Sequence, residues 1–170
     1  MQRVARFHLV SLGQFQRDME KLFPELDIEE IREKYENIQL PKRATIGSAG
    51  YDFFAPIDIS LKANETLLIP TGIRVAIVEG WVLKCYPRSS LGFKYRMQLN
   101  NTVGIIDSDY FNADNEGHIL VKVTNNSNGD QVLHIKSGEG FIQGIFLEYG
   151  ITYDDDVEGL RRGGFGSTNV

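Results

Sequence analysis

The spacing of hydrophobic residues changes near residue 40. Residues 3–10 alternate loosely between two faces, which predicts a short strand. Between residues 12 and 36 the apolar residues instead recur at helical spacing, on one face before Pro24 and on another after it: Phe15, Met19, Leu22 and Phe23, then Ile28, Ile31 and Tyr35. In SLGQ (11–14) and DIEE (27–30), a capping residue precedes glutamine or glutamate by three positions. The pattern predicts a strand followed by two short helices.

After residue 40 the pattern changes to brief apolar runs. Glycine, asparagine and proline separate them at intervals of roughly ten residues, and the runs are YDFFA, TLLIPTGIRVAIV, WVLKCYP, HILVKVTN, QVLHIKS and FIQGIFLEYG. This spacing is typical of a β-sandwich or β-barrel, and no helix of useful length is expected after residue 40. With 170 residues and 42% apolar content, we expect one domain spanning residues 1–170.

Charge and cysteine content narrow the possible partners and compartment. A net charge of −5 disfavours a nucleic-acid groove or an anionic membrane face, because both require a basic surface. The single cysteine, Cys85, excludes an internal disulfide framework and a thiolate zinc site. No apolar run approaches the ~20 residues of a membrane span, and the N-terminus lacks a secretory signal. We therefore expect an intracellular, cytoplasmic protein, with a mobile C-terminal arm at about 156–170 unless something docks it.

Five polar clusters interrupt or follow the apolar runs: AGYDFFA (49–55), PRSSLG (87–92), NNTVGIIDSDY (100–110), GEGFIQ (138–143) and GGFGST (163–168). Each cluster alone has an ordinary explanation as a turn or a surface ion pair. Together they offer an arginine and hydroxyls for phosphates, and a glycine-rich tail whose phenylalanine can stack on a base. Asp107 adds a carboxylate that can orient and deprotonate an attacking water. The set predicts a nucleotide site.

In this order and at these separations, the five clusters resemble the five motifs of the trimeric dUTP diphosphatases (dUTPases), over roughly residues 44–168. The resemblance implies an all-β protomer, a distorted β-barrel or jelly roll of the dUTPase-like β-clip type, to which the helical pattern adds a small N-terminal insert at about 12–36. It also implies a homotrimer in which each active site takes residues from more than one subunit. The implied reaction converts dUTP to dUMP and pyrophosphate, which keeps uracil out of DNA and supplies dUMP for thymidylate synthesis.

The resemblance also implies residue roles. Asp107 would activate the water that attacks the α-phosphorus, and Tyr110 would pack on the deoxyribose and leave no room for a 2′-hydroxyl. Uracil would be contacted by Asn101, Gly104, Ile105, Ile106 and Leu120. The phosphates would be held by Arg88, Ser89, Ser90 and Gln143, and the tail would contribute Arg161, Phe165, Gly166 and Ser167. Mg²⁺ is expected, bound mainly by triphosphate oxygens and water, with Asp52 supporting either Arg88 or a metal-bound water.

Three features depart from the family pattern. The helical stretch at 12–36 has no counterpart in compact members, and YFNADNEGH (110–118) is longer than the expected turn between tyrosine and glycine. In the tail, the arginine expected shortly before the glycines is displaced to Arg161 or Arg162. GEGFIQ also lacks the arginine often found where Gly140 stands. The insert either packs on its own barrel or binds a protein partner.

Other polar residues receive structural interpretations. If the strand continued past Asp107, Asp109 would face the same side, but two close carboxylates would raise one pKa and harm a base, so a structural role is favoured. Cys85 is expected to be a small core residue. The histidines show no metal-ligand spacing and are expected on the surface or in the core: His8, His118 and His134.

Two alternatives to dUTP hydrolysis are open. A dCTP deaminase of the same fold would need a glutamate beside the base, a few residues after the glycine of the third motif, where Val121 and Lys122 stand. A signalling protein would keep the nucleotide pocket and act through a partner docked on the insert.

Overall fold

The structure, a computed structural model, describes residues 1–157 and residue 159. Its helices are α1 (Leu12–Leu22), α2 (Ile28–Glu36), α3 (Ser89–Tyr95) and the 3-10 helix η1 (Ser108–Asn112). Its strands are β1 (Ala5–Leu9), β2 (Lys42–Arg43), β3 (Tyr51–Phe54), β4 (Ile59–Leu61), β5 (Thr66–Pro70), β6 (Ile73–Ile77), β7 (Trp81–Pro87), β8 (Gln98–Leu99), β9 (Gly104–Ile106), β10 (Leu120–Thr124), β11 (Leu133–Ile135) and β12 (Gly140–Glu148). The expected strand-rich fold with a small helical insert is confirmed.

The two predicted helices of the insert are confirmed, and local capping explains where they begin. The Ser11 hydroxyl accepts a hydrogen bond from the Gln14 N–H at 3.1 Å. Asp27 and Glu30 form the reciprocal capping box that their spacing predicts, at 2.8 and 2.9 Å. The inward faces of the helices join the same hydrophobic core as the strands, through Phe15, Met19 and Ile31. The apolar face of the insert therefore packs on its own protein.

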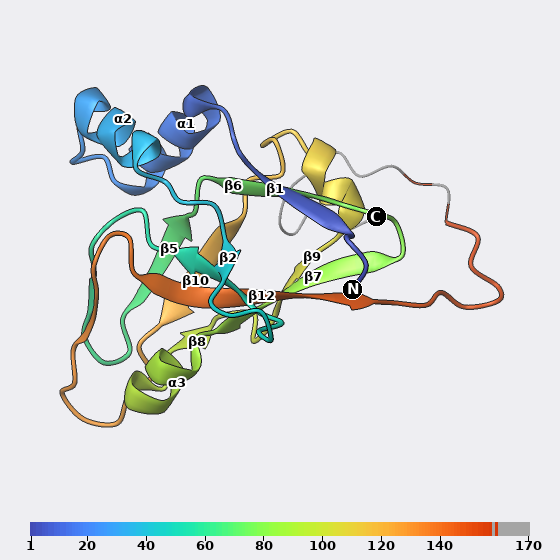
Figure 1. Ribbon diagram of the computed structural model, residues 1–170. Helices are drawn as coiled ribbons and strands as arrows, with labels where there is room; N and C mark the ends of the chain where they lie inside the picture. Colours follow the sequence, from blue (N-terminus) through green and yellow to red (C-terminus); the bar gives the residue numbers. More distant parts are fainter. Residues whose placement is uncertain (158, 160–170) are drawn as a thin grey trace.

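The sheets bring residues from distant motifs side by side. A five-stranded sheet has the order β2-β3-β12-β7-β9, and a three-stranded sheet has the order β5-β10-β8. Strand β12 crosses the molecule in Figure 1 and places Gln143 opposite Asp52 of β3 and Tyr86 of β7. On the other side of β7, Cys85 lies opposite Gly104 of β9. Four of the five motifs therefore meet on one sheet.

Two short helices after residue 40 correct the sequence-based expectation. Helix α3 begins inside the RSS motif, with Arg88 as its N-cap residue. It was not foreseen because Gly92 lowers its helix propensity and Ser89 and Ser90 are typical of turns. Helix η1 begins directly after Asp107, so the chain is not extended between Asp107 and Asp109. The condition under which Asp107 and Asp109 would share a strand face is therefore not met, and a structural role for Asp109 stays a prediction. Across the described residues, no helix has the length and apolar character that crossing a membrane requires.

Candidate active site

A cavity of about 400 Å³ opens between β9, β10 and the turn before β9. It is lined by Leu68, Cys85, Leu99, Asn100, Asn101, Gly104, Ile106, Ile119, Leu120, Val121 and Lys122. Four of the five residues predicted to contact uracil are among them. The fifth, Ile105, is 45% exposed between two buried neighbours because side chains alternate along a strand. Contact of Ile105 with a base through its main chain stays a prediction.

Cys85 forms part of this cavity wall, a position that sequence reasoning missed. It was expected only to be a core residue, and it is indeed 2% exposed. A Cβ atom on Gly104 would lie 3.2 Å from the Cys85 Cβ, so the hairpin approaches β7 closely because residue 104 has no side chain. Burial raises the pKa of the Cys85 thiol to about 12. The thiol is therefore protonated at neutral pH and adds no charge to the cavity.

Asp107 and Tyr110 follow the cavity wall directly in sequence. Asp107 is half-buried and comes immediately after Ile106, which lines the cavity. Tyr110 is 2% exposed in this chain, and its hydroxyl donates to the His118 carbonyl oxygen at 2.8 Å. The same hydroxyl accepts a hydrogen bond from Asn115 Nδ2 at 2.8 Å. The tyrosine is thus fixed in position, and its contact with a sugar stays a prediction.

A second polar cluster gathers Asp52 of β3, Gln143 of β12 and Arg88, which directly follows β7. Arg88 Nε lies 3.4 Å from Asp52 Oδ1, which is the supporting contact that the sequence predicted as one of two roles for Asp52. Arg88 Nη1 donates to the Gly140 carbonyl oxygen at 3.2 Å. Gln143 Nε2 donates to the carbonyl oxygen of Pro87 at 3.5 Å. Ser89 and Ser90 follow Arg88 at the start of α3, and both are exposed.

Two glycines leave room for the long side chains of this cluster. A Cβ on Gly140 would lie 2.8 Å from Arg88 Nη1, so a larger residue there would have to displace the guanidinium. Position 140 therefore lacks the arginine often found there, and the guanidinium of Arg88 occupies the space next to it. A Cβ on Gly50 would lie 2.6 Å from Gln143 Oε1. The glycine of AGYD therefore makes space for a residue of the fourth motif.

The remaining predicted site residues lie outside the described part of the chain, namely Arg161, Phe165, Gly166 and Ser167. Within residues 1–157 and 159, no cluster of three or more histidines, cysteines or carboxylates can hold a metal ion. The Asp52 carboxylate faces Arg88. The described side chains form no metal cage, and binding of Mg²⁺ mainly by triphosphate oxygens and water stays a prediction.

The strand-rich fold thus carries a cavity that ends next to Asp107 and a polar cluster around Arg88. The sequence model of the dUTPase family matches residues 36–169. A deoxyuridine 5′-triphosphate nucleotidohydrolase of Lactococcus lactis is 42% identical over 146 residues, which cover 83% of this chain and 96% of the relative. The chain belongs to the dUTPase family, as the resemblance of its motifs indicated, and it is a hydrolase of dUTP.

Solved structures agree with this assignment. The crystal structure of a dUTPase from Streptococcus mutans is 33% identical, has a TM-score of 0.62, and covers 86% of this chain and 97% of its own. The dUTPase of Staphylococcus aureus phage phi11 is 19% identical with a TM-score of 0.63, over 92% of this chain and 98% of its own. That phage structure is described as coordinating a structural Mg(II) ion. At this low identity, the phage enzyme supports the fold alone.

Proposed function

We propose that the chain cleaves dUTP to dUMP and pyrophosphate by in-line attack of a water on the α-phosphorus, with Asp107 as the base. The supporting observation is the position of Asp107, which is half-buried and directly follows a wall residue of the cavity. The carboxylate takes the proton of the water as the new oxygen–phosphorus bond forms. The bond from the α-phosphorus to the bridging oxygen breaks, and pyrophosphate leaves.

The base and sugar are assigned to the cavity. Its apolar walls suit a flat ring, and Asn101 together with the backbone of Gly104 offers polar groups at one edge. Rigid main-chain donors and acceptors would reject the reversed pattern of cytosine, and a narrow slot would reject the methyl group of thymine. Tyr110 is assigned to the deoxyribose. Its two hydrogen bonds hold the ring in one place, as a group that excludes a 2′-hydroxyl requires.

The phosphates are assigned to the Arg88 cluster. Asp52 and the Gly140 carbonyl hold the guanidinium, while the exposed hydroxyls of Ser89 and Ser90 offer short donors. Arg161, Phe165, Gly166 and Ser167 would close over the ligand from the C-terminal arm. Mg²⁺ bound by the triphosphate and water, with Asp52 reached through a water, would neutralise phosphate charge.

We further propose that the chain is one domain and acts as a homotrimer. Support for one domain comes from the single core cluster that joins the insert to the strands. Support for assembly comes from the family and from large apolar side chains left exposed in the single chain, such as Ile46 at 87% and Phe93 at 91%. Sedimentation velocity should give three times the mass of one chain.

The alternatives make different products. Val121 and Lys122 line the cavity where a deaminase would need a carboxylate, which favours hydrolysis. A signalling role would use the outer face of the insert, because its apolar face is buried in its own core. We would assay dUTP, dCTP, dTTP and UTP side by side, with and without magnesium, and measure pyrophosphate and ammonia. Preferential release of pyrophosphate from dUTP supports the proposal, and ammonia from dCTP would overturn it.

A further inference from the structure

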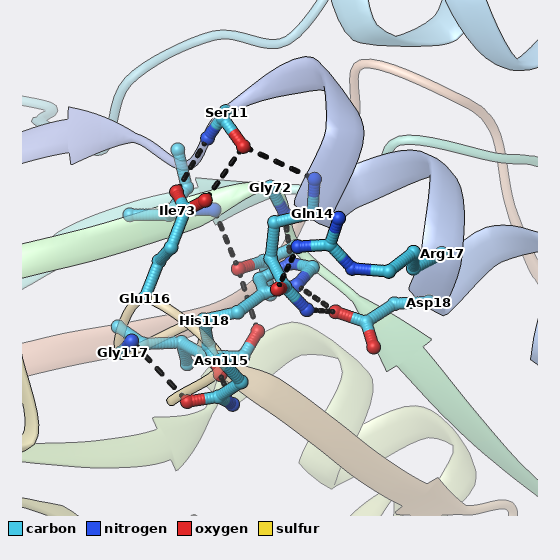
Figure 2. Close-up of polar contacts among 12 residues, drawn as sticks. Ser11, Gln14, Arg17, Asp18, Gly72, Ile73, Asn115, Glu116, Gly117 and His118 are labelled. Carbon is cyan, nitrogen blue, oxygen red and sulfur yellow. Dashed lines mark hydrogen bonds and ion pairs between the residues drawn. The ribbon is translucent and has the colours of Figure 1, made fainter. Parts of the chain in front are cut away.

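Two departures from the compact family pattern, the insert and the long connection after Tyr110, contact one another. We call residues 113–119, between η1 and β10, the docking loop. The Glu116 carboxylate of this loop accepts hydrogen bonds from both the Ser11 N–H, at 2.7 Å, and the Ser11 hydroxyl, at 2.6 Å. Ser11 is the N-cap of α1, so the docking loop caps the insert from across the fold (Figure 2).

A buried histidine makes the second link between the docking loop and the insert. His118 is fully buried, and its Nδ1 lies 2.5 Å from Asp18 Oδ2 on α1. Its Nε2 accepts the Gly72 N–H at 2.7 Å. A ring nitrogen that accepts a hydrogen bond carries no proton, so the proton of the neutral ring is on Nδ1 and is donated to Asp18. Asp18 thereby fixes both the tautomer and the orientation of the ring.

The docking loop in turn holds Tyr110. The hydroxyl of Tyr110 donates to the backbone oxygen of His118 and accepts from Asn115 Nδ2. Gly117 lets the loop approach this closely, because a Cβ there would lie 2.5 Å from the Tyr110 carbonyl oxygen. Every hydrogen bond described here for the Tyr110 hydroxyl therefore comes from the loop that the insert anchors.

The same loop continues into the cavity wall. Ile119 follows His118, lines the cavity, and donates its N–H to the Ile73 carbonyl at 2.9 Å. Its own carbonyl accepts the Thr71 hydroxyl at 2.7 Å. Both Thr71 and Ile73 flank Gly72, whose N–H reaches the His118 ring. Asp18, His118 and the wall residue Ile119 thus belong to one connected network.

We propose that the helical insert sets the sugar selectivity of the enzyme, with Asp18 and His118 as positioning residues that act through the Tyr110 hydroxyl. This inference rests on the proposed function, because it uses the role assigned there to Tyr110. Burying a polar network of this kind is costly unless each member is paired, and once paired it specifies one arrangement. A hydrophobic contact between the docking loop and α1 would keep the loop on the insert but would not fix the position of the Tyr110 hydroxyl.

The test measures kcat/KM for dUTP and for UTP in Asp18→Ala, Asp18→Asn and Asp27→Ala. Asp18→Ala removes the partner of His118, and the dUTP-to-UTP ratio should fall by about threefold to thirtyfold, the range of indirect coupling effects. Asp18→Asn keeps an oxygen acceptor and should restore most of the ratio. Asp27→Ala removes the cap of α2 outside the network and should leave the ratio unchanged. Equal falls in Asp18→Ala and Asp27→Ala would overturn the proposal.

A double-mutant cycle separates positioning through Tyr110 from general loosening of the cavity. Tyr110→Phe keeps the ring and removes only the hydroxyl, so Asp18→Ala should add little to its effect on the ratio. The same fold-change in both backgrounds would overturn the proposal. If Asp18→Ala does not fold, Glu116→Gln, which weakens the contact between the docking loop and Ser11, takes its place in the cycle, with the same expected and contrary outcomes. Wild-type protein that does not prefer dUTP would instead refute the proposed function.

Discussion

The Arg88 cluster and the junction between the insert and the docking loop are both polar, yet they are built differently. The side chain of Arg88 is 40% exposed, and its Nε lies 3.4 Å from Asp52 Oδ1. At the junction His118 is fully buried and both of its ring nitrogens are hydrogen bonded, at 2.5 and 2.7 Å. Loosely held, exposed groups remain available to a ligand, whereas closed networks fix a shape. The comparison separates residues proposed to contact substrate from residues proposed to position them.

Asp107→Asn should have the largest effect on the substrate-facing side. Loss of a general base should lower kcat by about 10²- to 10⁴-fold, while nucleotide affinity and the free energy of unfolding change little. Single-turnover kinetics with dUTP and calorimetric binding of a non-hydrolysable analogue would measure both. Asp109→Asn removes a carboxylate two residues away and serves as the control. Undiminished turnover in Asp107→Asn would remove this residue from its assigned role.

Arg88→Ala should come next, with an effect on substrate rather than on stability. Losing charge-assisted hydrogen bonds of about 1.5–3 kcal/mol should lower kcat/KM for dUTP by about tenfold to hundredfold. Arg96→Ala removes an equal charge from an exposed position that bonds only to Asn128 among the contacts described here, so it is the matched control. If Arg88→Ala mainly lowered the denaturant midpoint, the contrast between the two regions would fail.

Local patterns made the helix starts, the strand texture and the motif residues predictable from sequence. The SLGQ and DIEE caps depend on contacts three residues apart, and both formed. The Asp18–His118 pair spans 100 residues and has no periodic or motif signal, so only the fold could bring it together. Helix α3 was missed because its glycine and serines have low helix propensity. Cys85 was missed as a cavity residue because its pairing with Gly104 depends on strand register, which neighbouring residues in the sequence do not determine.

Gly117→Ala tests the junction between the insert and the docking loop, and it should lower the free energy of unfolding. Residue 117 has φ +67° and no room for a Cβ, so the free energy of unfolding should fall by about 2–4 kcal/mol. Gly129→Ala is the matched control, because Gly129 has φ +92° but open space around it. It should lose only about 1 kcal/mol, the cost of the backbone conformation. Urea unfolding measures both free energies. Equal losses in the two variants would show that the docking loop does not pack closely against Tyr110.

The smallest effect concerns pH and distinguishes the junction from the rest of the surface. The hydrogen bond from the Ser11 hydroxyl holds the pKa of Glu116 below its ordinary value. Burial raises the pKa of Asp18, but hydrogen bonds from His118 and Gln14 outweigh it, so this pKa is lowered as well. A carboxyl whose pKa is lower in the folded state stabilises the protein fully above its unfolded-state pKa, and this stabilisation is lost as the pH falls through the folded-state value.

Stability should therefore decline as the pH drops below the ordinary carboxyl range, about 4. Glu116→Gln cannot titrate, so its urea midpoint should decline less steeply from pH 5 to pH 3 than that of the wild type. Glu29→Gln removes a carboxylate from the exposed face of α2 and controls for net charge. If both variants flattened the profile equally, the acid sensitivity would come from overall charge and not from the contact between the docking loop and the insert. If the urea midpoint of Glu116→Gln alone depended less on pH, the acid sensitivity would come from the contact between Glu116 and Ser11.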